Sequence, residues 1–181
     1  MRKKIKTMKK TLFTLLAITV IFGCSNSDKK VLHNNLYFSN DLESVKGWME
    51  YNTLRQGNAH SGNYYSTTDS AWQFSQTFVL HAGEISAKPL KKVDVSVWAN
   101  VSKDHFNGCI VTCITRNDST IFWASSDLKN FYKKTGEWFQ ANASFNLPAS
   151  IIQSDKVKIY VWNVDGKSEI KMDDMEIQFY N

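Results

Sequence analysis

Apolar and polar residues alternate with a period of two along much of the chain after residue 24. The alternation is clearest in four segments, 93–101, 139–145, 157–162 and 170–179. Successive residues of a strand point to opposite faces of a sheet, so this period predicts strands with one buried face. The last segment changes phase at Asp173-Asp174. Such a break predicts a β-bulge, in which one extra residue re-aims the side chains.

Turn-forming residues separate the predicted strands, and no window after residue 24 keeps a helical period. Clusters of Gly, Asn, Asp and Ser occur at 56–58, 61–63, 117–119, 134–136 and 164–166. Short strands with regular turns predict an all-β fold, either a β-sandwich or a barrel. A single domain of about 146 residues, 36–181, buries roughly 68% of its unfolded surface and needs no disulfide bonds.

Two cysteines lie in one further apolar segment, 108–114, which is rich in β-branched residues and predicts a buried strand. Cys109 and Cys113 fall on the same face, roughly 13 Å apart at ~3.3 Å per residue. A disulfide requires Cα atoms within ~7 Å, so these two cannot bridge each other. We interpret both as buried free thiols, since no His or further Cys is in register for a metal site.

The first 23 residues have the features of a signal peptide. A basic segment, 1–10, precedes an apolar segment, 11–22, of 12 residues. A bilayer-spanning helix takes ~20 residues, so this segment is too short to span. The end, Ile21-Phe22-Gly23-Cys24, resembles the signal of bacterial lipoproteins, in which the cysteine is lipidated and becomes the new N-terminus. The alternative is an ordinary secretion signal beside an incidental cysteine.

The resemblance implies a lipid anchor at Cys24 in the bacterial cell envelope, on the outer membrane or the cell surface. Residues 24–35 are polar and predict a tether between this anchor and the domain. An acyl chain contributes ~0.8 kcal/mol of membrane affinity for each buried CH₂ group.

The net charge of +5 comes from the signal segment. Residues 1–23 hold six of the 22 Lys and Arg residues and none of the 17 acidic ones, so the remainder has a net charge of −1. A nucleic-acid-binding surface needs clustered basic residues, so we expect no nucleic-acid partner. Aromatic residues, at 13% of the chain, are the compositional feature that requires an explanation.

The order of short motifs along 40–180 resembles the galactose-binding-like jelly roll, the fold of many carbohydrate-binding modules. These motifs are Asn40–Glu43 with Gly47-Trp48, Ala59–Gly62, Val93–Trp98, Glu137-Trp138 with Phe145–Pro148, Val157–Asn163 and Met172–Met175. The resemblance implies a two-sheet antiparallel β-sandwich, usually with one structural Ca²⁺. Relatives with this fold serve several functions, so the fold alone does not define one.

The calcium ion implied by the resemblance requires six to eight oxygen ligands. Glu43, Ser61 and Asp173 match the family's ligand positions, and Asp41 and Asp174 are substitutes for the acids. Such an ion would stabilise the fold and would not be catalytic. The alternative is that Asp173 and Asp174 are two solvated acids at the end of a strand.

Three aromatic residues alternate with the aliphatic rows and are therefore expected to face outward. These are Trp98, Tyr160 and Trp162. The apolar face of a sugar ring stacks on such side chains, and Asn100 provides a polar group beside Trp98. The alternative is that loops such as 64–65 or 131–132 cover these rings. The other tryptophans, at 48, 72, 123 and 138, are predicted to be packing residues.

Catalytic motifs are absent from the sequence. The four histidines form no metal-binding pair, and neither a nucleophile elbow nor a glycine-rich phosphate loop occurs. We therefore predict a membrane-anchored, non-catalytic, carbohydrate-binding lipoprotein that binds a polysaccharide or other glycan. The alternatives are a protein-interaction or assembly module with an envelope protein partner, and a glycan-active enzyme that uses a pair of acids.

Overall fold

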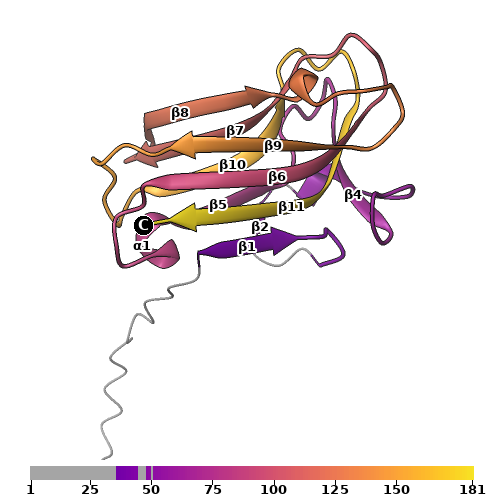
Figure 1. Cartoon of the computed structure of the whole chain (residues 1–181). Helices are drawn as coiled ribbons and strands as arrows, with labels where there is room; N and C mark the ends of the chain where they lie inside the picture. The colour runs from indigo at the N-terminus through magenta and orange to yellow at the C-terminus, as the bar shows by residue number, and fades with distance from the viewer. Residues whose placement is uncertain (1–35, 45–47, 50) are drawn as a thin grey trace, which may run out of the picture. The chain divides into compact units, whose positions relative to one another are not determined.

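The computed structural model describes residues 36–44, 48–49 and 51–181. The predicted signal peptide, lipidation site and tether lie outside these residues. The described residues belong to one unit, and their strands form two antiparallel sheets that pack face to face (Figure 1). The predicted two-sheet β-sandwich is therefore confirmed.

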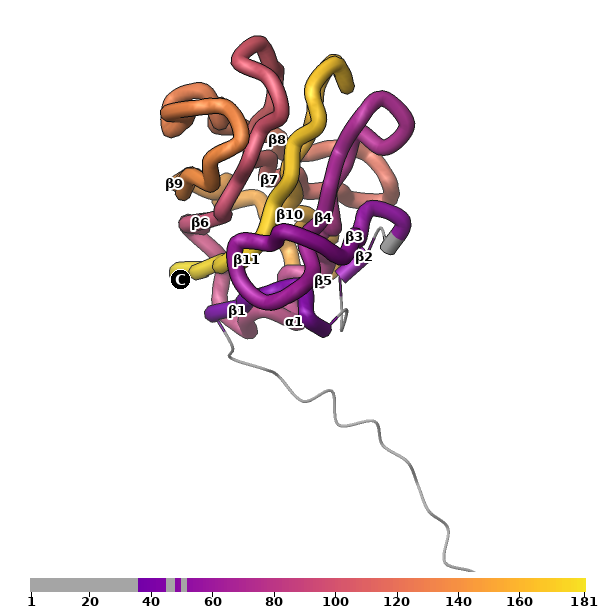
Figure 2. The backbone as a smooth tube through the Cα atoms, turned by 90° about the vertical axis from the view of Figure 1, so that its right-hand side faces the viewer, coloured from indigo at the N-terminus to yellow at the C-terminus, as the bar shows by residue number. Residues whose placement is uncertain are grey.

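The first sheet, called sheet 1, has the strand order β3-β4-β11-β6-β9, and β1 also pairs with β11. In Figure 2 the strands of sheet 1 follow one another in this order from right to left, from β3 and β4 through β11 to β6 and β9. Sheet 1 contains β1 (Tyr37–Asn40), β3 (Leu54–Gln56), β4 (Tyr64–Thr68), β6 (Lys92–Val101), β9 (Phe139–Asn146) and β11 (Ile170–Tyr180).

The second sheet, called sheet 2, has the strand order β2-β5-β10-β7-β8. It contains β2 (Trp48–Met49), β5 (Thr77–His81), β7 (Gly108–Arg116), β8 (Ser119–Asp127) and β10 (Lys156–Asn163). Helical structure among the described residues is limited to three short segments, η1 (Tyr51–Thr53), α1 (Ala82–Ile85) and η2 (Leu128–Asn130). No described helix is long and apolar enough to cross a membrane.

The core lies between the two sheets and is built from the predicted aliphatic rows. In β6 and β10 every second residue is buried, and the residues between them are partly exposed. Phe78 of β5 and Phe179 of β11 contact each other across the core, with ring centroids 5.9 Å apart. Fully burying such a side chain contributes about 1.5–3 kcal/mol, so these rows hold the two layers together.

The predicted β-bulge is present in β11. The pairing of β11 with β6 shifts register between Asp173 and Glu176, and Asp174 has a positive φ of 45°. Met172 and Met175 on either side of the bulge both point into the core. The bulge therefore directs both aspartates, as well as Glu176, away from the core.

Both cysteines of β7 are buried free thiols, as predicted. They lie on the outer side of sheet 2 and not in the space between the sheets, together with Val111 and under Tyr160 and Trp162. Burial raises the pKa of the Cys109 thiol to about 11, so it is protonated and unreactive at neutral pH.

Candidate functional site: a polar groove on sheet 1

The outer face of sheet 1 carries a groove that crosses strands β1, β11, β6 and β9. One cavity of about 400 Å³ opens over the middle of these strands. A second cavity of about 430 Å³ lies next to it, over β1 and the bulge of β11. Tyr37 and Glu176 line both cavities, so the two join into one groove.

Polar side chains form the floor of the groove because they are the outward residues of the alternating strands. In the register of the sheet, Glu176 of β11 lies opposite Ser96 of β6, and Ser96 lies opposite Asn142 of β9. The other polar residues that line the first cavity are Asp94, Ser144 and Gln178. Carboxylate, amide and hydroxyl groups therefore stand side by side on one surface.

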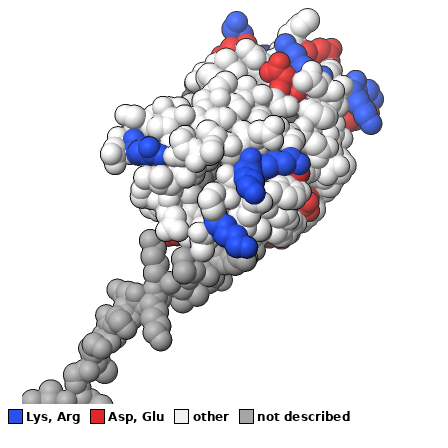
Figure 3. Space-filling model, turned by 60° about the vertical axis from the view of Figure 1, so that its left-hand side comes forward, with Lys and Arg blue, Asp and Glu red and all other residues white. Residues whose placement is uncertain are grey.

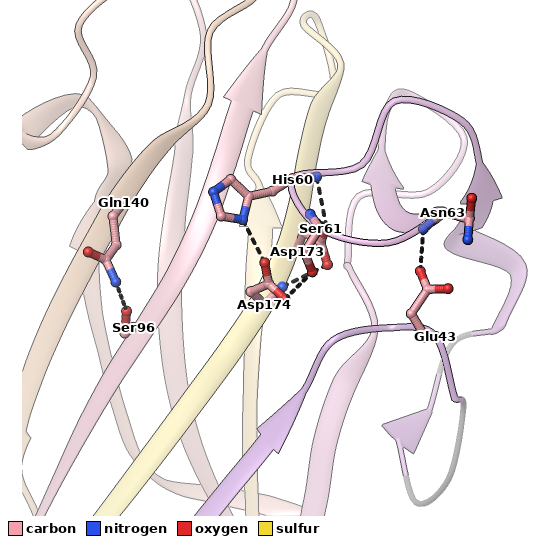
Figure 4. A network of polar contacts seen from close by, with 8 residues as sticks. All are labelled: Glu43, His60, Ser61, Asn63, Ser96, Gln140, Asp173 and Asp174. Carbon is pink, nitrogen blue, oxygen red and sulfur yellow. Dashed lines mark hydrogen bonds and ion pairs between the residues drawn. The ribbon is translucent and has the colours of Figure 1, made fainter.

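Two side chains of this floor have no partner within the described part of the chain. The side chains of Glu176 and Asn142 make no hydrogen bond or ion pair there, whereas the Ser96 hydroxyl accepts a hydrogen bond of 2.9 Å from Gln140 (Figure 4). Tyr37, 45% exposed, presents its aromatic ring beside the same floor. A flat ring with hydrogen-bonding groups beside it is the usual design of a site for a small polar ligand.

Asp94 is held in its ionised form. Its carboxylate accepts a hydrogen bond of 2.9 Å from the Lys92 ammonium group. Burial acts to raise the pKa of Asp94, but the hydrogen bonds of Lys92, Ser144 and Tyr180 and the charge of Lys92 together outweigh it, and the pKa is lowered. The groove therefore contains a carboxylate that accepts, and does not donate, hydrogen bonds at neutral pH.

A loop between β3 and β4 closes one end of this face, and three acids anchor it (Figure 4). The carboxylate of Asp173 accepts backbone N–H bonds from His60 at 2.8 Å and Ser61 at 3.0 Å. Asp174 accepts hydrogen bonds of 2.6 Å from the His60 ring and 2.7 Å from the Ser61 hydroxyl. Hydrogen bonds thus hold the loop to the bulge of β11, which lies more than 100 residues later in the chain.

Asp173 is fully buried under this loop. Burial raises the pKa of Asp173 to about 6, against the opposite effect of its backbone hydrogen bonds, and the charge of Asp174 adds to the rise. The Glu43 carboxylate, which accepts N–H bonds from Asn63 and Tyr64, has a lowered pKa because of them.

Two of the calcium ligands predicted from the sequence, Glu43 and Asp173, thus already accept hydrogen bonds from backbone N–H groups. Among the described residues, no three His, Cys, Asp or Glu side chains form a group that holds a metal ion. The loop offers its N–H groups to Glu43 and Asp173, whereas a calcium ion requires oxygen ligands. The geometry favours a hydrogen-bonded loop anchor over a calcium site at Glu43, Ser61 and Asp173. The calcium site that the sequence resemblance implied is thus untested, and melting with and without Ca²⁺ distinguishes it from the loop anchor.

Trp98 and Asn100 lie on the outer face of sheet 1, but neither lines the groove cavities. The His60 ring stacks on the Trp98 ring, with centroids 3.7 Å apart and planes 13° apart. His60 thereby covers one face of the indole. The Asn100 amide donates to the carbonyl of Gly136 at 2.7 Å and so holds the loop before β9.

Tyr160 and Trp162 lie on the opposite side of the sandwich, on the outer face of sheet 2. The prediction of an aromatic sheet face formed by Trp98, Tyr160 and Trp162 together is therefore wrong, since Trp98 lies on the other sheet. Period-two alternation distinguishes inward from outward residues, but it does not say which sheet a strand joins. Sheet membership depends on pairing between distant segments.

The outer face of sheet 2 has an aromatic cluster of its own. Phe74, 46% exposed, lies 5.5 Å from Tyr160 and 6.1 Å from Trp162, and Trp123, 48% exposed, lies 6.3 Å from Trp162. The prediction that Trp123 and Trp72 are packing residues is wrong, since Trp72 is also 41% exposed. Trp48 is buried in the core, as predicted.

Several solved structures of other proteins are similar to this fold. The two xylan-binding domains of Paenibacillus barcinonensis Xyn10C are 14% and 16% identical to this chain, with TM-scores of 0.51 and 0.54. The matches cover 78% and 79% of this chain and 92% and 99% of those domains. The C-terminal family 22 carbohydrate-binding module of Clostridium thermocellum Xyn10B has 15% identity and a TM-score of 0.54, over 80% of this chain and 93% of that one.

The fold is the jelly roll of these carbohydrate-binding modules. No protein-family model and no curated protein sequence matches the chain. The expected galactose-binding-like jelly roll is confirmed by the structural likeness. At these identities the likeness shows the fold alone. The function is therefore inferred from the residues of the groove.

Proposed function

We propose that this domain binds a glycan chain in the groove on the outer face of sheet 1. The observation that carries the proposal is the arrangement of Tyr37 and Glu176, which line both cavities together with the polar floor. Sugar hydroxyl groups donate to carboxylates and accept from amides, and the apolar face of a sugar ring packs on an aromatic ring. The two adjoining cavities, of about 400 and 430 Å³, offer room for more than one sugar unit.

We propose that binding occurs without catalysis. Glycoside hydrolysis requires one carboxylic acid that is protonated near neutral pH, which needs a raised pKa. In the groove, Asp94 has a lowered pKa beside Lys92. Asp173 has a raised pKa, but its carboxyl group is buried under the loop and bonded to backbone N–H groups. Neither acid fulfils the role of the proton donor.

The location we propose is the bacterial cell envelope, through a lipid attached at Cys24. This proposal rests on the sequence Ile21–Cys24 and on the polar segment that follows it. Cys24→Ala is expected to release the protein from membranes during detergent-free extraction. A Cys24→Ala protein that remains in the membrane fraction would contradict the anchor.

Titration calorimetry with neutral oligosaccharides, beginning with xylohexaose, tests the glycan proposal. We expect Tyr37→Ala and Asn142→Ala each to weaken binding about tenfold, which corresponds to about 1.4 kcal/mol. Trp123→Ala, on the outer face of sheet 2, is the matched control and should bind as the unchanged protein does. Equal weakening by all three variants, or by Trp123→Ala alone, would overturn the assignment of the site to sheet 1.

The aromatic cluster on sheet 2 supports a second candidate function, an interaction or assembly module. Phe74 and Trp123 expose nearly half of their surface there, and exposed aromatic side chains are enriched at protein interfaces. A pull-down from an envelope extract that gives one stoichiometric protein partner, lost in Trp123→Ala, would favour this function. Recovery of the same partner with Trp123→Ala would speak against it.

A further inference from the structure

The groove is lined by acids and by no base among the described residues around its two cavities. The acids are Asp41, Asp94, Asp174 and Glu176. The nearest base is Lys92, whose ammonium group lies 2.9 Å from the Asp94 carboxylate without lining either cavity. On the face drawn in Figure 3, Lys and Arg stand in separate small groups. The acidic lining is therefore a property of the groove, since the domain as a whole is close to neutral.

The four carboxylates differ in how many hydrogen bonds and ion pairs they form within the protein. Asp94 is paired with Lys92, Asp174 accepts hydrogen bonds from His60 and Ser61, and Asp41 accepts one from the backbone N–H of Glu43. The side chain of Glu176 has neither a hydrogen bond nor an ion pair in the described part of the chain. It is also exposed and shared by both cavities, so its charge stands where a bound chain would pass.

A carboxylate in this position discriminates between ligands by charge. A sugar hydroxyl donates to it, and a hydrogen bond with one charged partner is roughly twice as strong as a neutral one. A carboxylate or sulfate on the ligand has no proton to donate at neutral pH. Like charges brought together in a binding site repel each other and weaken binding.

Resting on the glycan function proposed above, we infer that the groove accepts uncharged sugar chains and rejects chains that carry carboxylate or sulfate groups. Glu176 is the main specificity-determining residue, and Asp94 on the diagonally adjacent position of β6 adds to the effect. The ion pair with Lys92 offsets part of the charge of Asp94, which is why Glu176 comes first.

The test compares two derivatives of xylan that have the same degree of substitution. Hydroxyethyl groups add bulk without charge, and carboxymethyl groups add bulk with a negative charge. The full chain, kept in a nonionic detergent, is titrated with each polymer at low salt, about 20 mM, and at high salt, about 0.5 M. The same titrations are made with Asp94→Asn/Glu176→Gln and with a control, Asp118→Asn/Asp127→Asn, which removes two charges from β8 and the turn before it.

We expect the unchanged protein to bind hydroxyethyl xylan at least about fivefold more tightly than carboxymethyl xylan at low salt, and less selectively at high salt. The Asp94→Asn/Glu176→Gln variant should reduce this ratio to within about twofold, and the control should preserve it. A ratio of one or below, or an unchanged ratio in Asp94→Asn/Glu176→Gln, would overturn the inference while glycan binding stands. Binding of neither derivative nor of unsubstituted xylan would count against the proposed glycan function, and the inference would fall with it.

Discussion

At the scale of single residues, the most informative group is the buried carboxyl of Asp173. It lies on the outer side of β11, yet the loop between β3 and β4 removes it from water. Its backbone hydrogen bonds favour the ionised form, and burial opposes it. The pKa of about 6 means that burial wins. Ionised Asp173 therefore costs stability at pH 7.

This imbalance predicts an unusual pH dependence. The pKa of Asp173 is raised to about 6 from 3.8, so the folded state takes up a proton before the unfolded state does. Lowering the pH from 7.5 to 5 should therefore increase the contribution of Asp173 to the free energy of unfolding by about 1.4 kcal/mol. Urea unfolding at both pH values, compared with Asp173→Asn, measures this change.

The difference in unfolding free energy between the unchanged protein and Asp173→Asn should shift in favour of the unchanged protein at pH 5. A difference that stays constant, or that shifts the other way, would show that Asp173 is not a buried acid with a raised pKa.

At the scale of structural elements, the loop between β3 and β4 depends on a glycine. Gly62 has a φ of +59°, and a Cβ atom there would lie 2.4 Å from Oε1 of Glu43. Glu43 in turn accepts the N–H bonds of Asn63 and Tyr64. A side chain at position 62 would therefore displace the carboxylate that fixes the loop.

Gly62→Ala and Gly136→Ala form a matched pair. Gly136 has a φ of +78°, but a Cβ atom there meets no atom within 4 Å. In both variants the left-handed backbone lowers the free energy of unfolding by about 1–2 kcal/mol. We expect Gly62→Ala to lower it measurably further, because its new Cβ atom also meets Glu43. Thermal melting of both proteins compares them. Equal losses would mean that the Glu43 contact does not hold the loop.

The same loop gives the calcium prediction a direct test. The N–H groups of His60, Ser61, Asn63 and Tyr64 already occupy the carboxylates of Asp173 and Glu43. We therefore expect the melting temperature to change by less than about 1 °C between millimolar Ca²⁺ and EGTA, because a ligand stabilises a fold only by binding its native state. A rise of several degrees with Ca²⁺, lost in Asp173→Asn, would establish the calcium site.

At the scale of the whole molecule, the sequence predicted an all-β domain, the inward rows and the bulge at Asp173-Asp174. These features follow from local alternation, which residues 93–101 and 157–162 show without interruption. Alternation left a sandwich and a barrel open, and the order of the short motifs along 40–180 favoured the sandwich. The sequence did not predict that Trp98 and Trp162 lie on opposite faces. That difference depends on β6 pairing with β9 and β11, while β10 pairs with β5 and β7.

The groove was missed for the same reason. Asp94, Ser96 and Asn142 were visible as outward residues, but only the register of β6 with β9 and β11 brings them beside Glu176. Tyr37 belongs to a strand of four residues, too short to show a period. Trp123 lies on β8 at the edge of sheet 2, where outward residues have a neighbouring strand on one side only. The assumption that it packs against the core therefore failed.

The most direct test of the proposed glycan site is to map bound glycan onto the outer faces of the two sheets by NMR. The ¹⁵N-labelled protein is titrated with xylohexaose, and amide shift changes are assigned along the chain. We expect the changes to concentrate at Tyr37, in β6 and β9 around Ser96 and Asn142, and in β11 around Glu176. Changes concentrated in β8 and β10 around Trp123 and Trp162, with none in the groove, would contradict the proposed site.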